Sequence, residues 1–454
     1  MKNQPFSLRF GGSVAAMLVP FTLLGLIAGG PAGASPIVRI GAQIVVSRQG
    51  APTSSDCLAI IGVPCYSPQQ IRTAYGLNSL INGGWVGFGQ TIVLIESYGS
   101  PTLEADLKQF DADFGLPDPP SLTVLAPLGT VPFDPTNPEM ITWAFETTLD
   151  VEWAHAMAPG AKIVVLTSPV AETQGVQGLP EFLALETYAL DHHLGTIISQ
   201  SWATAENTLF TPQGQAVIAG FSGLYERARN ERVTVLSSAG DTGSANPEAD
   251  GATFYPFPTV GFPASSPLVT AVGGTSLSIN ILGTYQSETV WNDGAGAGGG
   301  GISQVFQTPD YQKQWLSPST RSALAGHRGI PDVSFNADPI NSAILVYISA
   351  GASVGIPAGY YLIGGTSEGA PSWAGIVADL NQYAGAPLGF LNPALYALGG
   401  QGLFHDFGHD VTVGNNSFAG VPGYSATVGW DLATGWGTPE FNLLPARWWA
   451  FNGR

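Results

Sequence analysis

Two hydrophobic patterns alternate along most of the chain. Short runs of apolar and β-branched residues are typical of strands, and several runs are continuously hydrophobic, as expected for strands covered on both faces. Between them, apolar residues recur with the helical period. This alternation predicts an α/β fold with a mostly parallel central sheet and helices on both faces. The expected strands are 91–98, 122–126, 162–167, 196–202, 233–238 and 342–349, and the expected helices are 102–114, 143–157, 180–191, 213–229 and 371–383.

The beginning of the chain has a different pattern. Lys2 and Arg9 precede an apolar run over about 13–30, and Ala32-Gly-Ala34 follows it. This order is typical of a secretory signal peptide with its cleavage site. An uncleaved membrane anchor is the alternative, but Pro20 and the many glycines of the run weaken it. We therefore expect a secreted, extracellular protein that is not attached to a membrane after signal cleavage.

Two cysteines, Cys57 and Cys65, lie close together shortly after this leader. Export would place them in an oxidising compartment, so we expect a local disulfide. Their spacing does not match a metal site, which needs further Cys or His ligands nearby. The expected organisation is a signal peptide over 1–34, a short N-terminal segment over 35–65 that carries both cysteines, and one large α/β domain over 66–454 that includes cation-binding loops near its C-terminal end.

The charge of the chain limits its partners. It has 33 Asp and Glu against 15 Lys and Arg, a formal net charge of −18. Such a surface disfavours nucleic acids and anionic membranes. Protonation of carboxylates in acid would reduce this self-repulsion without building a large positive charge, so the composition suits a protein that works at low pH.

Residues 363–375 carry the most informative motif, Ile-Gly-Gly-Thr-Ser-Glu-Gly-Ala-Pro-Ser-Trp-Ala-Gly. An apolar strand-like run passes through glycines onto the first turn of a helix, which is expected to expose Ser367 as a nucleophile. The simpler interpretation is a serine that caps the helix. A hydroxyl is a poor nucleophile unless a base takes its proton, so the available bases decide the chemistry.

One alternative places this serine in another class of hydrolase. Residues 365–369 also match Gly-x-Ser-x-Gly, the nucleophile elbow of α/β-hydrolases, which predicts an esterase or lipase. That fold requires an acid and then a histidine later in the chain. Asp379, His405 and His409 are available for these roles, although His409 is flanked by what better fits a cation-binding loop.

Glu146 and Asp150 are the other candidate bases. They lie four residues apart in an expected helix, a spacing that brings two carboxylates onto one face. A solvated helix face is the simpler interpretation, but the flanking Trp143 and Trp153 indicate partial burial. Two partly buried carboxyls cannot both ionise freely, so one pKa rises and a proton is shared, which prepares a base that functions in acid.

Three further polar or aromatic residues come at the ends of expected strands. Asp241 follows the strand over 233–238, and Glu96 and Trp202 end two others. Because ligands bind at the carboxyl ends of parallel strands, these residues are candidates for the same site. Asp241 lies between glycines and is equally typical of a turn. The glycine-rich run 294–301 is by default a flexible loop, although its bare backbone could also approach a ligand closely.

Two glycine-rich stretches near the C-terminus suggest a cation site. Asp410-Val411 and the run Thr427-Val-Gly429-Trp-Asp431 combine two carboxylates with exposed carbonyls, the oxygen ligands that Ca²⁺ prefers. Ordinary loop aspartates are the simpler interpretation.

Taken together, these motifs resemble the sedolisin family, the serine-carboxyl peptidases. The family pattern Gly-Thr-Ser-x-x-x-Pro appears as Gly365-Thr-Ser367-Glu-Gly-Ala-Pro371, and the similarity spans the chain from about Tyr66 to its C-terminus. No single stretch is decisive, but six in the expected order are highly specific. The supporting stretches are 66–77, 146–153 with 156–163, 238–243, 328–334 and 429–435.

The resemblance implies a subtilisin-like fold and a role for each candidate. Ser367 would attack the scissile carbonyl of a polypeptide substrate, Glu146 would act as general base and then acid, and Asp150 would orient Glu146. Asp241, protonated, would donate to the oxyanion. Glu96 and Trp202 would extend this hydrogen-bond network.

The resemblance also implies one structural Ca²⁺, bound by the side chains of Asp410 and Asp431 and by the carbonyls of Val411, Thr427 and Gly429. Thr427 replaces a usual glycine. We expect a monomer and a secreted, acid-active endopeptidase.

The chain departs from the family pattern upstream of the body. The family implies a large folded prodomain, whereas only about thirty residues separate the expected signal peptide from the body. This departure leaves open a catalytically silent, exported binding protein on the peptidase fold.

Overall fold

The computed structural model describes residues 39–44, 50–404 and 408–441 of the 454-residue chain. The expected signal peptide 1–34 lies outside the described residues. Among the residues described, no helix combines the length and the apolar character needed to cross a bilayer.

The main sheet has eight strands, and its pairings are parallel except at one edge. Its order is β11-β10-β8-β6-β3-β5-β4, with β14 also paired to β10, and only the β10–β11 pairing is antiparallel. This confirms the expected mostly parallel sheet. The strands are β3 (Thr91–Ser97), β4 (Leu122–Leu125), β5 (Lys162–Ser168), β6 (Ile197–Gln200), β8 (Thr234–Ser238), β10 (Thr270–Ile279), β11 (Tyr285–Val290) and β14 (Val333–Asn336).

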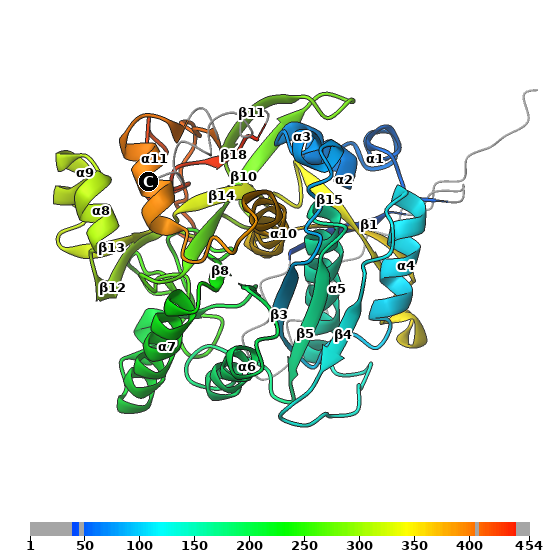
Figure 1. Cartoon of the computed structure of the whole chain (residues 1–454), viewed down its shortest axis with the longest axis horizontal. Coiled ribbons are helices and arrows are strands. Elements are labelled where there is room, and N and C mark those ends of the chain that lie inside the picture. The colour runs from blue at the N-terminus through cyan, green and yellow to red at the C-terminus, as the bar shows by residue number, and fades with distance from the viewer. Residues whose placement is uncertain (1–38, 45–49, 405–407, 442–454) are drawn as a thin grey trace, which may run out of the picture.

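Helices cover both faces of this sheet, as expected. On one face α5 (Pro138–Met157) and α10 (Thr366–Ala384) pack over the strands and against each other, and on the other face α6 (Leu179–Asp191) and α7 (Pro212–Asn230) form a second hydrophobic core (Figure 1). α4 (Leu103–Phe114) packs beside α5. All five expected helices are therefore present, but α5 and α10 begin earlier than expected, at Pro138 and Thr366, so that Pro371 lies inside α10.

α5 is the central helix of the site and is buried nearly along its whole length. Asn137 caps it by accepting hydrogen bonds from the N–H groups of Glu139 and Met140, and Pro138 occupies its first position, where a missing N–H costs nothing. Every residue from Met140 to Met157 is buried. Burial on all sides explains why the acidic residues of α5 lie inside the protein rather than on a solvated face.

The last expected strand, 342–349, is confirmed as β15 (Ala343–Ile348), but it belongs to a second sheet. This sheet has the order β1-β16-β15-β2, with β1 (Arg39–Ile44), β16 (Gly359–Gly364) and β2 (Cys65–Tyr66). β1 pairs with β16, so the described part of the expected N-terminal segment 35–65 is integrated into the fold. Cys57 of α1 (Ser54–Ile61) forms the expected disulfide with Cys65.

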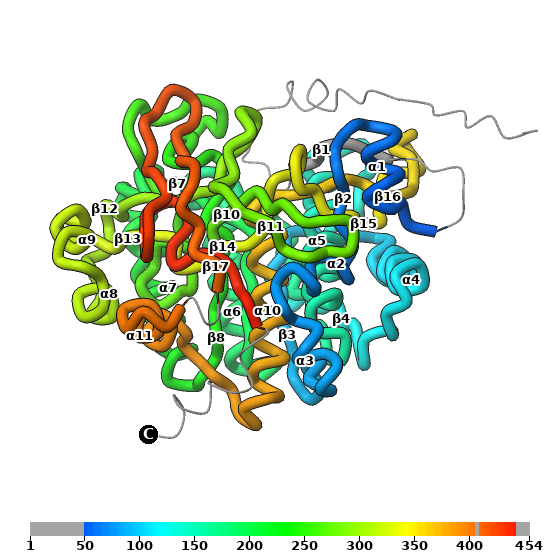
Figure 2. The backbone as a smooth tube through the Cα atoms, turned by 90° about the horizontal axis from the view of Figure 1, so that it is seen from above, coloured from blue at the N-terminus to red at the C-terminus, as the bar shows by residue number. Residues whose placement is uncertain are grey.

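Short elements complete the molecule around the two sheets. Figure 2 shows the C-terminal loops gathered at one side of the main sheet, beside β10 and β14. The remaining helices and strands are α2 (Pro68–Ala74), α3 (Asn78–Asn82), α8 (Asp310–Trp315), α9 (Pro318–Ala323), α11 (Asn392–Gly400), η2 (Glu206–Leu209), η3 (Ala352–Val354), β7 (Thr204–Ala205), β9 (Gly261–Phe262), β12 (Gly301–Gln307), β13 (His327–Ile330), β17 (Gly408–His409) and β18 (Thr438–Pro439).

Candidate active site

Ser367 lies on the first turn of α10, directly after β16. Gly365 joins the two elements with φ 111°, a conformation that favours glycine, and α10 begins at Thr366. The expected strand–glycine–helix arrangement is therefore confirmed. The expected exposure of Ser367 is wrong: its side chain is fully buried, because the segments that follow β6 and β8 pack against this turn.

Asp241 contacts the residue next to Ser367. It follows β8, and its Oδ1 accepts hydrogen bonds from the N–H and the hydroxyl of Thr366, both at 2.8 Å. The Thr366 hydroxyl in turn accepts from the Gly240 N–H at 3.0 Å. Asp241 thus holds the N-terminus of α10 across 125 residues of sequence rather than closing a local turn. This places a carboxyl beside the main chain of Ser367, where a helix N-terminus favours negative charge.

The glycine-rich run 294–301 is ordered against Asp241. The Ala297 N–H donates to the Asp241 carbonyl at 3.0 Å, and the Gly299 N–H donates to the Gly240 carbonyl at 2.7 Å. A Cβ at Gly299 would lie 2.1 Å from the Ala239 carbonyl oxygen, so no side chain fits there. The expectation of a flexible loop is therefore wrong, because close backbone packing requires these glycines.

A cluster of buried carboxyls lies where α5 meets the carboxyl ends of the strands. Glu146, Asp150 and Glu96 have no exposed surface. Burial raises the pKa of Glu96 well above its usual range, and the nearby Glu146 charge raises it further. Burial likewise raises the pKa of Asp150, with the Glu96 charge as the next cause.

The contacts of Glu96 and Asp150 are all with uncharged or acidic groups. Each of the two carboxyls acts on the pKa of the other, the nearby Ser201 hydroxyl lowers the pKa of Asp150 against the effect of burial, and the Thr147 hydroxyl donates to Glu96 Oε2 at 3.4 Å. Among the described residues, neither Glu96 nor Asp150 forms an ion pair with Lys, Arg or His. Two buried carboxyls that lie close together without a cation favour protonation of at least one of them.

α10, which carries Ser367, packs closely on α5, which carries Glu146 and Asp150. Gly375 permits this approach, since a Cβ there would lie 2.8 Å from the Ala154 carbonyl oxygen. The Ser201 hydroxyl donates to the Ser367 carbonyl at 3.4 Å. The same hydroxyl lies near Asp150 and lowers its pKa against the effect of burial.

Trp202 lies next to this cluster but takes another environment. Its ring packs against Phe182 and Phe221, with ring centroids 4.7 Å and 5.9 Å away, in the core between the sheet and α6 and α7. Its Nε1 finds no hydrogen-bond partner among the described residues. A role for Trp202 in the hydrogen-bond network therefore stays a prediction.

Three polar residues of the site were missed by sequence reasoning: Ser201, Thr147 and Thr366. Ser201 directly precedes Trp202 at a strand end, and Thr147 and Thr366 are neighbours of the candidates Glu146 and Ser367. The available signal was adjacency to a candidate. It is weak, because Ser and Thr are common at such positions for structural reasons.

The groups required by the esterase alternative have other partners. The His409 ring stacks on Tyr285 at 3.6 Å, and its Nε2 lies 3.3 Å from Glu440. Asp379 is fully buried on α10, and the charge that acts on it is that of Arg72. His405 lies outside the described residues.

The expected calcium ligands come together around one short loop. The Thr427 N–H donates to Asp431 Oδ2 at 2.7 Å, and the Gly429 N–H donates to Asp410 Oδ2 at 2.8 Å. Burial raises the pKa of Asp431 to about 6 and also raises that of Asp410. Val411 follows Asp410 and is buried. Two carboxylates with nearby carbonyls fit the oxygen preference of Ca²⁺.

No group of three or more His, Cys, Asp or Glu is arranged to hold a metal in the part of the chain that the structure describes. The expected calcium site uses two carboxylates and three main-chain carbonyls. The absence of such a side-chain group therefore does not test it.

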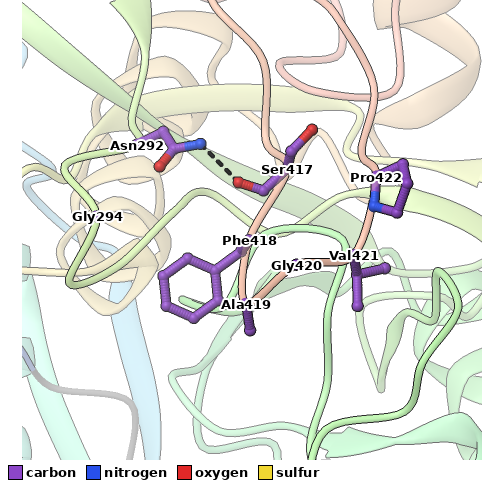
Figure 3. Close-up of a pocket in the computed structure, with 8 residues that line it drawn as sticks. All are labelled: Asn292, Gly294, Ser417, Phe418, Ala419, Gly420, Val421 and Pro422. Carbon is purple, nitrogen blue, oxygen red and sulfur yellow. Dashed lines mark hydrogen bonds between the residues drawn. The ribbon is translucent and has the colours of Figure 1, made fainter.

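A surface cavity of about 410 Å³ lies beside the loops of the site (Figure 3). Asn292 forms part of its wall and donates from Nδ2 to the Ser417 carbonyl at 2.7 Å, while Phe418 presents its ring. Gly294 also lines the cavity and begins the glycine-rich run that bonds to Asp241. A cavity of this volume is large enough to accept a side chain of a bound ligand.

Comparison with known proteins finds relatives of this chain. Kumamolisin of Bacillus sp. (strain MN-32) is 37% identical over 399 residues, 87% of this chain and 63% of kumamolisin. Sedolisin of Pseudomonas sp. (strain 101) is 27% identical over 435 residues, 93% of this chain and 67% of sedolisin. Tripeptidyl-peptidase 1 of Rattus norvegicus is 32% identical over 319 residues, 66% of this chain and 51% of that protein. The chain thus spans from 51% to 67% of the length of these relatives.

A solved structure agrees with these relatives. Pseudomonas sedolisin, a serine-carboxyl proteinase complexed with two molecules of pseudo-iodotyrostatin, is similar with a TM-score of 0.68 and 26% identity, over 86% of this chain and 99% of that one. No family model matches the chain. The similarity in sequence and structure together leads to one conclusion: the chain belongs to the sedolisin family and has its subtilisin-like α/β fold.

Proposed function

We propose that this protein is a secreted serine-carboxyl endopeptidase that cleaves polypeptides in acid. The observation that carries the proposal is the location of Ser367 at the N-terminus of α10, which packs on the carboxyl-bearing helix α5, in a chain of the sedolisin family. A carboxyl cluster rather than an imidazole would then supply the base.

In this mechanism Glu146 takes the proton of Ser367 as the hydroxyl attacks the scissile carbonyl, and returns it to the leaving amine. Asp150 orients Glu146 from the next turn of α5. The raised pKa values of Glu96 and Asp150 support a protonated carboxyl pair in mild acid. A carboxyl base suits this range, because a histidine with pKa near about 6.5 is almost wholly protonated at about pH 4.

Asp241 and the main chain of Ser367 would stabilise the oxyanion. A neutral carboxyl can donate a hydrogen bond, whereas an ionised one cannot, so Asp241 must be protonated for this role. Its Oδ1 accepts from Thr366, which fixes the carboxyl beside Ser367. The Ser367 N–H is one of the first four of α10 and therefore has no acceptor within the helix, which suits it as a second donor.

We further propose that the loop of Asp410, Asp431 and the carbonyls of Val411, Thr427 and Gly429 holds one structural Ca²⁺. Bound calcium would neutralise the two carboxylates and tie the loop together. Removal of calcium with a chelator should lower the thermal midpoint, by a free energy of about 2.7 kcal/mol if free calcium had been near 100 times its Kd. Asp431→Asn should abolish this response, whereas Asp250→Asn, in an exposed loop, should keep it.

The experiment that tests the proposed activity is cleavage of a denatured protein from about pH 3 to pH 7. Ser367→Ala should lower kcat by about 10⁵-fold or more. The matched control is Ser372→Ala, because Ser372 is also buried on α10 and its hydroxyl has no hydrogen-bond partner among the described residues. Equal cleavage by wild type and Ser367→Ala would remove Ser367 from the mechanism.

The two alternatives give different results in the same assay. An esterase would lose activity with His409→Gln and keep it with Glu146→Gln, whereas the proposed peptidase shows the opposite pattern. A silent binding protein on this fold would cleave nothing, and an active-site serine reagent would not label Ser367 in acid.

A further inference from the structure

We propose that Glu368, the residue directly after Ser367, is a positioning residue whose carboxyl ties the turn that carries the nucleophile to Asn336. This inference rests on the proposed peptidase function and adds a residue that the sequence motifs left unassigned. Glu368 lies in the first turn of α10 and has no exposed surface. The pattern Gly-Thr-Ser-x-x-x-Pro leaves this position free, so the pattern itself does not require a glutamate there.

The turn that carries Ser367 depends on hydrogen bonds from outside the helix. The first N–H groups of any helix have no acceptor within it. Pro371 has no N–H, so the Ser367 carbonyl also lacks the donor that a helix normally supplies four residues later. Two contacts from the main sheet compensate in part: Asp241 accepts from Thr366 at 2.8 Å, and the Ser201 hydroxyl donates to the Ser367 carbonyl at 3.4 Å.

The end of β14 and the residue after it hold the positions on either side of Ser367 in the sequence. The Ala337 carbonyl accepts from the Gly365 N–H at 2.6 Å. Asn336 Nδ2 donates to both carboxyl oxygens of Glu368, at 3.1 Å and 3.2 Å. One contact thus lies two residues before the nucleophile and the other directly after it, and both tie the turn to the same strand.

Asn336 is itself fixed, so it can serve as an anchor. It is fully buried, and its N–H donates to the Tyr75 hydroxyl at 3.0 Å. Its Nδ2 also donates to the Ser342 carbonyl at 2.8 Å, and its Oδ1 accepts from the Leu277 N–H at 3.3 Å. These contacts set the orientation of the Asn336 amide independently of α10, and the carboxyl of Glu368 is held against it.

The groups that face Glu368 are acidic or uncharged. The charges of Asp338, after β14, and Glu368 act on each other's surroundings without a cation between them, and Glu368 forms no ion pair with Lys, Arg or His among the described residues. Burial raises the pKa of Glu368 well above its usual range, and Asp338 raises it further, whereas the Asn336 hydrogen bond lowers it. The phenol of Tyr75 is the other titratable group on which Glu368 acts.

The remaining titratable residues of α10 and of the elements packed on it are mostly acids. They are Asp379 on α10, Glu139, Glu146, Asp150, Glu152 and His155 on α5, Glu96 on β3, and Asp241 and Asp332 in the segments next to β8 and β14.

The charge of Glu368 affects the reaction as well as the turn. A carboxyl oxygen accepts from Asn336 whether or not the group is ionised. An ionised Glu368, however, places a buried negative charge one residue from Ser367, where it opposes the charge that develops on the oxyanion. Glu368 therefore positions the turn without this penalty in acid, and its ionisation contributes to the loss of activity as the pH rises.

The test is steady-state cleavage by two variants across the pH range, with the folded fraction measured at each pH by tryptophan fluorescence. Glu368→Gln keeps an oxygen that accepts from Asn336 and cannot ionise. We expect its kcat in acid to stay within about twofold of wild type, and the alkaline midpoint of its kcat profile to move to higher pH.

Glu368→Leu keeps the apolar bulk of the side chain and removes the acceptor. We expect its kcat in acid to fall roughly 10-fold, the size of one net hydrogen bond, with KM within about twofold of wild type. If Glu368→Leu does not fold, Glu368→Met, which is unbranched like glutamate, replaces it with the same expectation.

Glu186→Gln is the matched control. Glu186 is another fully buried glutamate with a raised pKa, but it lies on α6, on the other face of the sheet. Its substitution can change stability with pH, yet it should leave kcat and the alkaline midpoint of the folded enzyme unchanged.

The outcomes distinguish this inference from the proposed function. In an enzyme that needs Ser367, an unmoved alkaline midpoint in Glu368→Gln, or a wild-type kcat in the Leu or Met variant, would overturn the role of Glu368 alone. An equal fall of kcat in Glu368→Gln and Glu368→Leu, or an equal shift of the midpoint in Glu186→Gln, would also overturn it. Activity that does not depend on Ser367 would overturn the proposed function itself.

Discussion

Two fully buried aspartates of this protein are stabilised in opposite ways. Asp332, between β13 and β14, accepts from Arg328 Nη2 at 2.6 Å, from the Tyr396 hydroxyl at 2.8 Å and from the Ala271 N–H at 2.8 Å. Asp150, at the candidate site, lies near the Ser201 hydroxyl and the Glu96 carboxyl, and it forms no ion pair with a cation among the described residues. Burial disfavours the charge of Arg328, yet the Asp332 carboxylate together with Tyr311 and Tyr396 outweighs this effect and raises the pKa of Arg328.

The difference separates a structural acid from one that is able to exchange a proton. A buried carboxylate paired with a cation keeps its charge, because neutralising either partner would leave the other unpaired. A buried carboxyl with no cation gains from holding a proton, and its charge can change during a reaction. Glu96 and Asp150 of the candidate site are acids of the second kind, since neither pairs with a cation among the described residues.

The largest effect is expected when Asp332, the buried acid with a cationic partner, loses that cation. Arg328→Met leaves Asp332 buried without positive charge, so we expect the free energy of unfolding to fall by about 3–5 kcal/mol. Urea denaturation with the folded enzyme assayed in parallel measures this, and activity per folded molecule should be retained.

The control for that variant is an exposed cation. Arg227 pairs with Asp191 at 2.5 Å and Glu231 at 2.7 Å, but 36% of its side chain is exposed. Arg227→Met should cost less than about 1 kcal/mol, since water screens such pairs. A loss of similar size in Arg328→Met would show that Asp332 does not depend on its cation.

A smaller effect, on activity instead of stability, is expected at Asp150, the buried acid without a cation. Asp150→Asn keeps the shape of the side chain and removes the charge that burial penalises. We expect kcat to fall about 100-fold, equivalent to about 2.7 kcal/mol, because the orienting carboxylate is lost. Stability at neutral pH should be equal to or higher than that of wild type.

Asp332→Asn completes the comparison with the opposite pattern. It removes the partner of Arg328 and should destabilise the protein while leaving the kcat of the folded enzyme unchanged. The contrast between the two aspartates fails if both Asn variants lose stability equally, or if both lose kcat equally.

Much of the fold could be predicted from the sequence, because burial on both faces leaves a strong signal. β3 and β5 each contain a continuous run of apolar, largely β-branched residues, and the expected positions of β3, β5 and β8 are confirmed. β10 and β14 were not expected. β10 contains Gly273 and Gly274, which weaken the strand pattern, and these glycines are needed because Pro331 and Ala337 pack against them.

The principal residues of the site could be predicted from the sequence, but the contacts between them could not. Ser367 and Asp241 could be singled out because glycines and strand ends mark them. The approach of Ser201 to Asp150 and its hydrogen bond to the Ser367 carbonyl depend on how α5 and α10 cross and on which strand lies beneath them, and neither is encoded locally. The burial of Ser367 was missed for the same reason, since segments distant in sequence cover it.

The smallest expected effect tests whether a buried acid without a cation is a feature of the candidate site alone or of the fold in general. Glu186 on α6 is fully buried, neither of its carboxyl oxygens has a hydrogen-bond partner among the described residues, and burial raises its pKa well above the usual range. As pH rises above about 4.5, the unfolded chain ionises this group while the folded protein still holds the proton. The stability contributed by protonated Glu186 is therefore lost with increasing pH, by up to about 1.4 kcal/mol per unit, until its folded pKa is passed.

Glu186→Gln should flatten this slope between about pH 5 and pH 7, with little change in stability at about pH 3, where both states are protonated. Urea denaturation across this range measures the slope, and Glu181→Gln on the partly exposed first turn of α6 is the control. An unchanged slope in Glu186→Gln would mean that burial without a cation carries no penalty there. The raised pKa of Asp150 would then have to come from its neighbour Glu96 more than from burial. A flattened slope would extend the comparison beyond the site: the fold as a whole would be adapted to acid, and the candidate site would use a property that its surroundings already have.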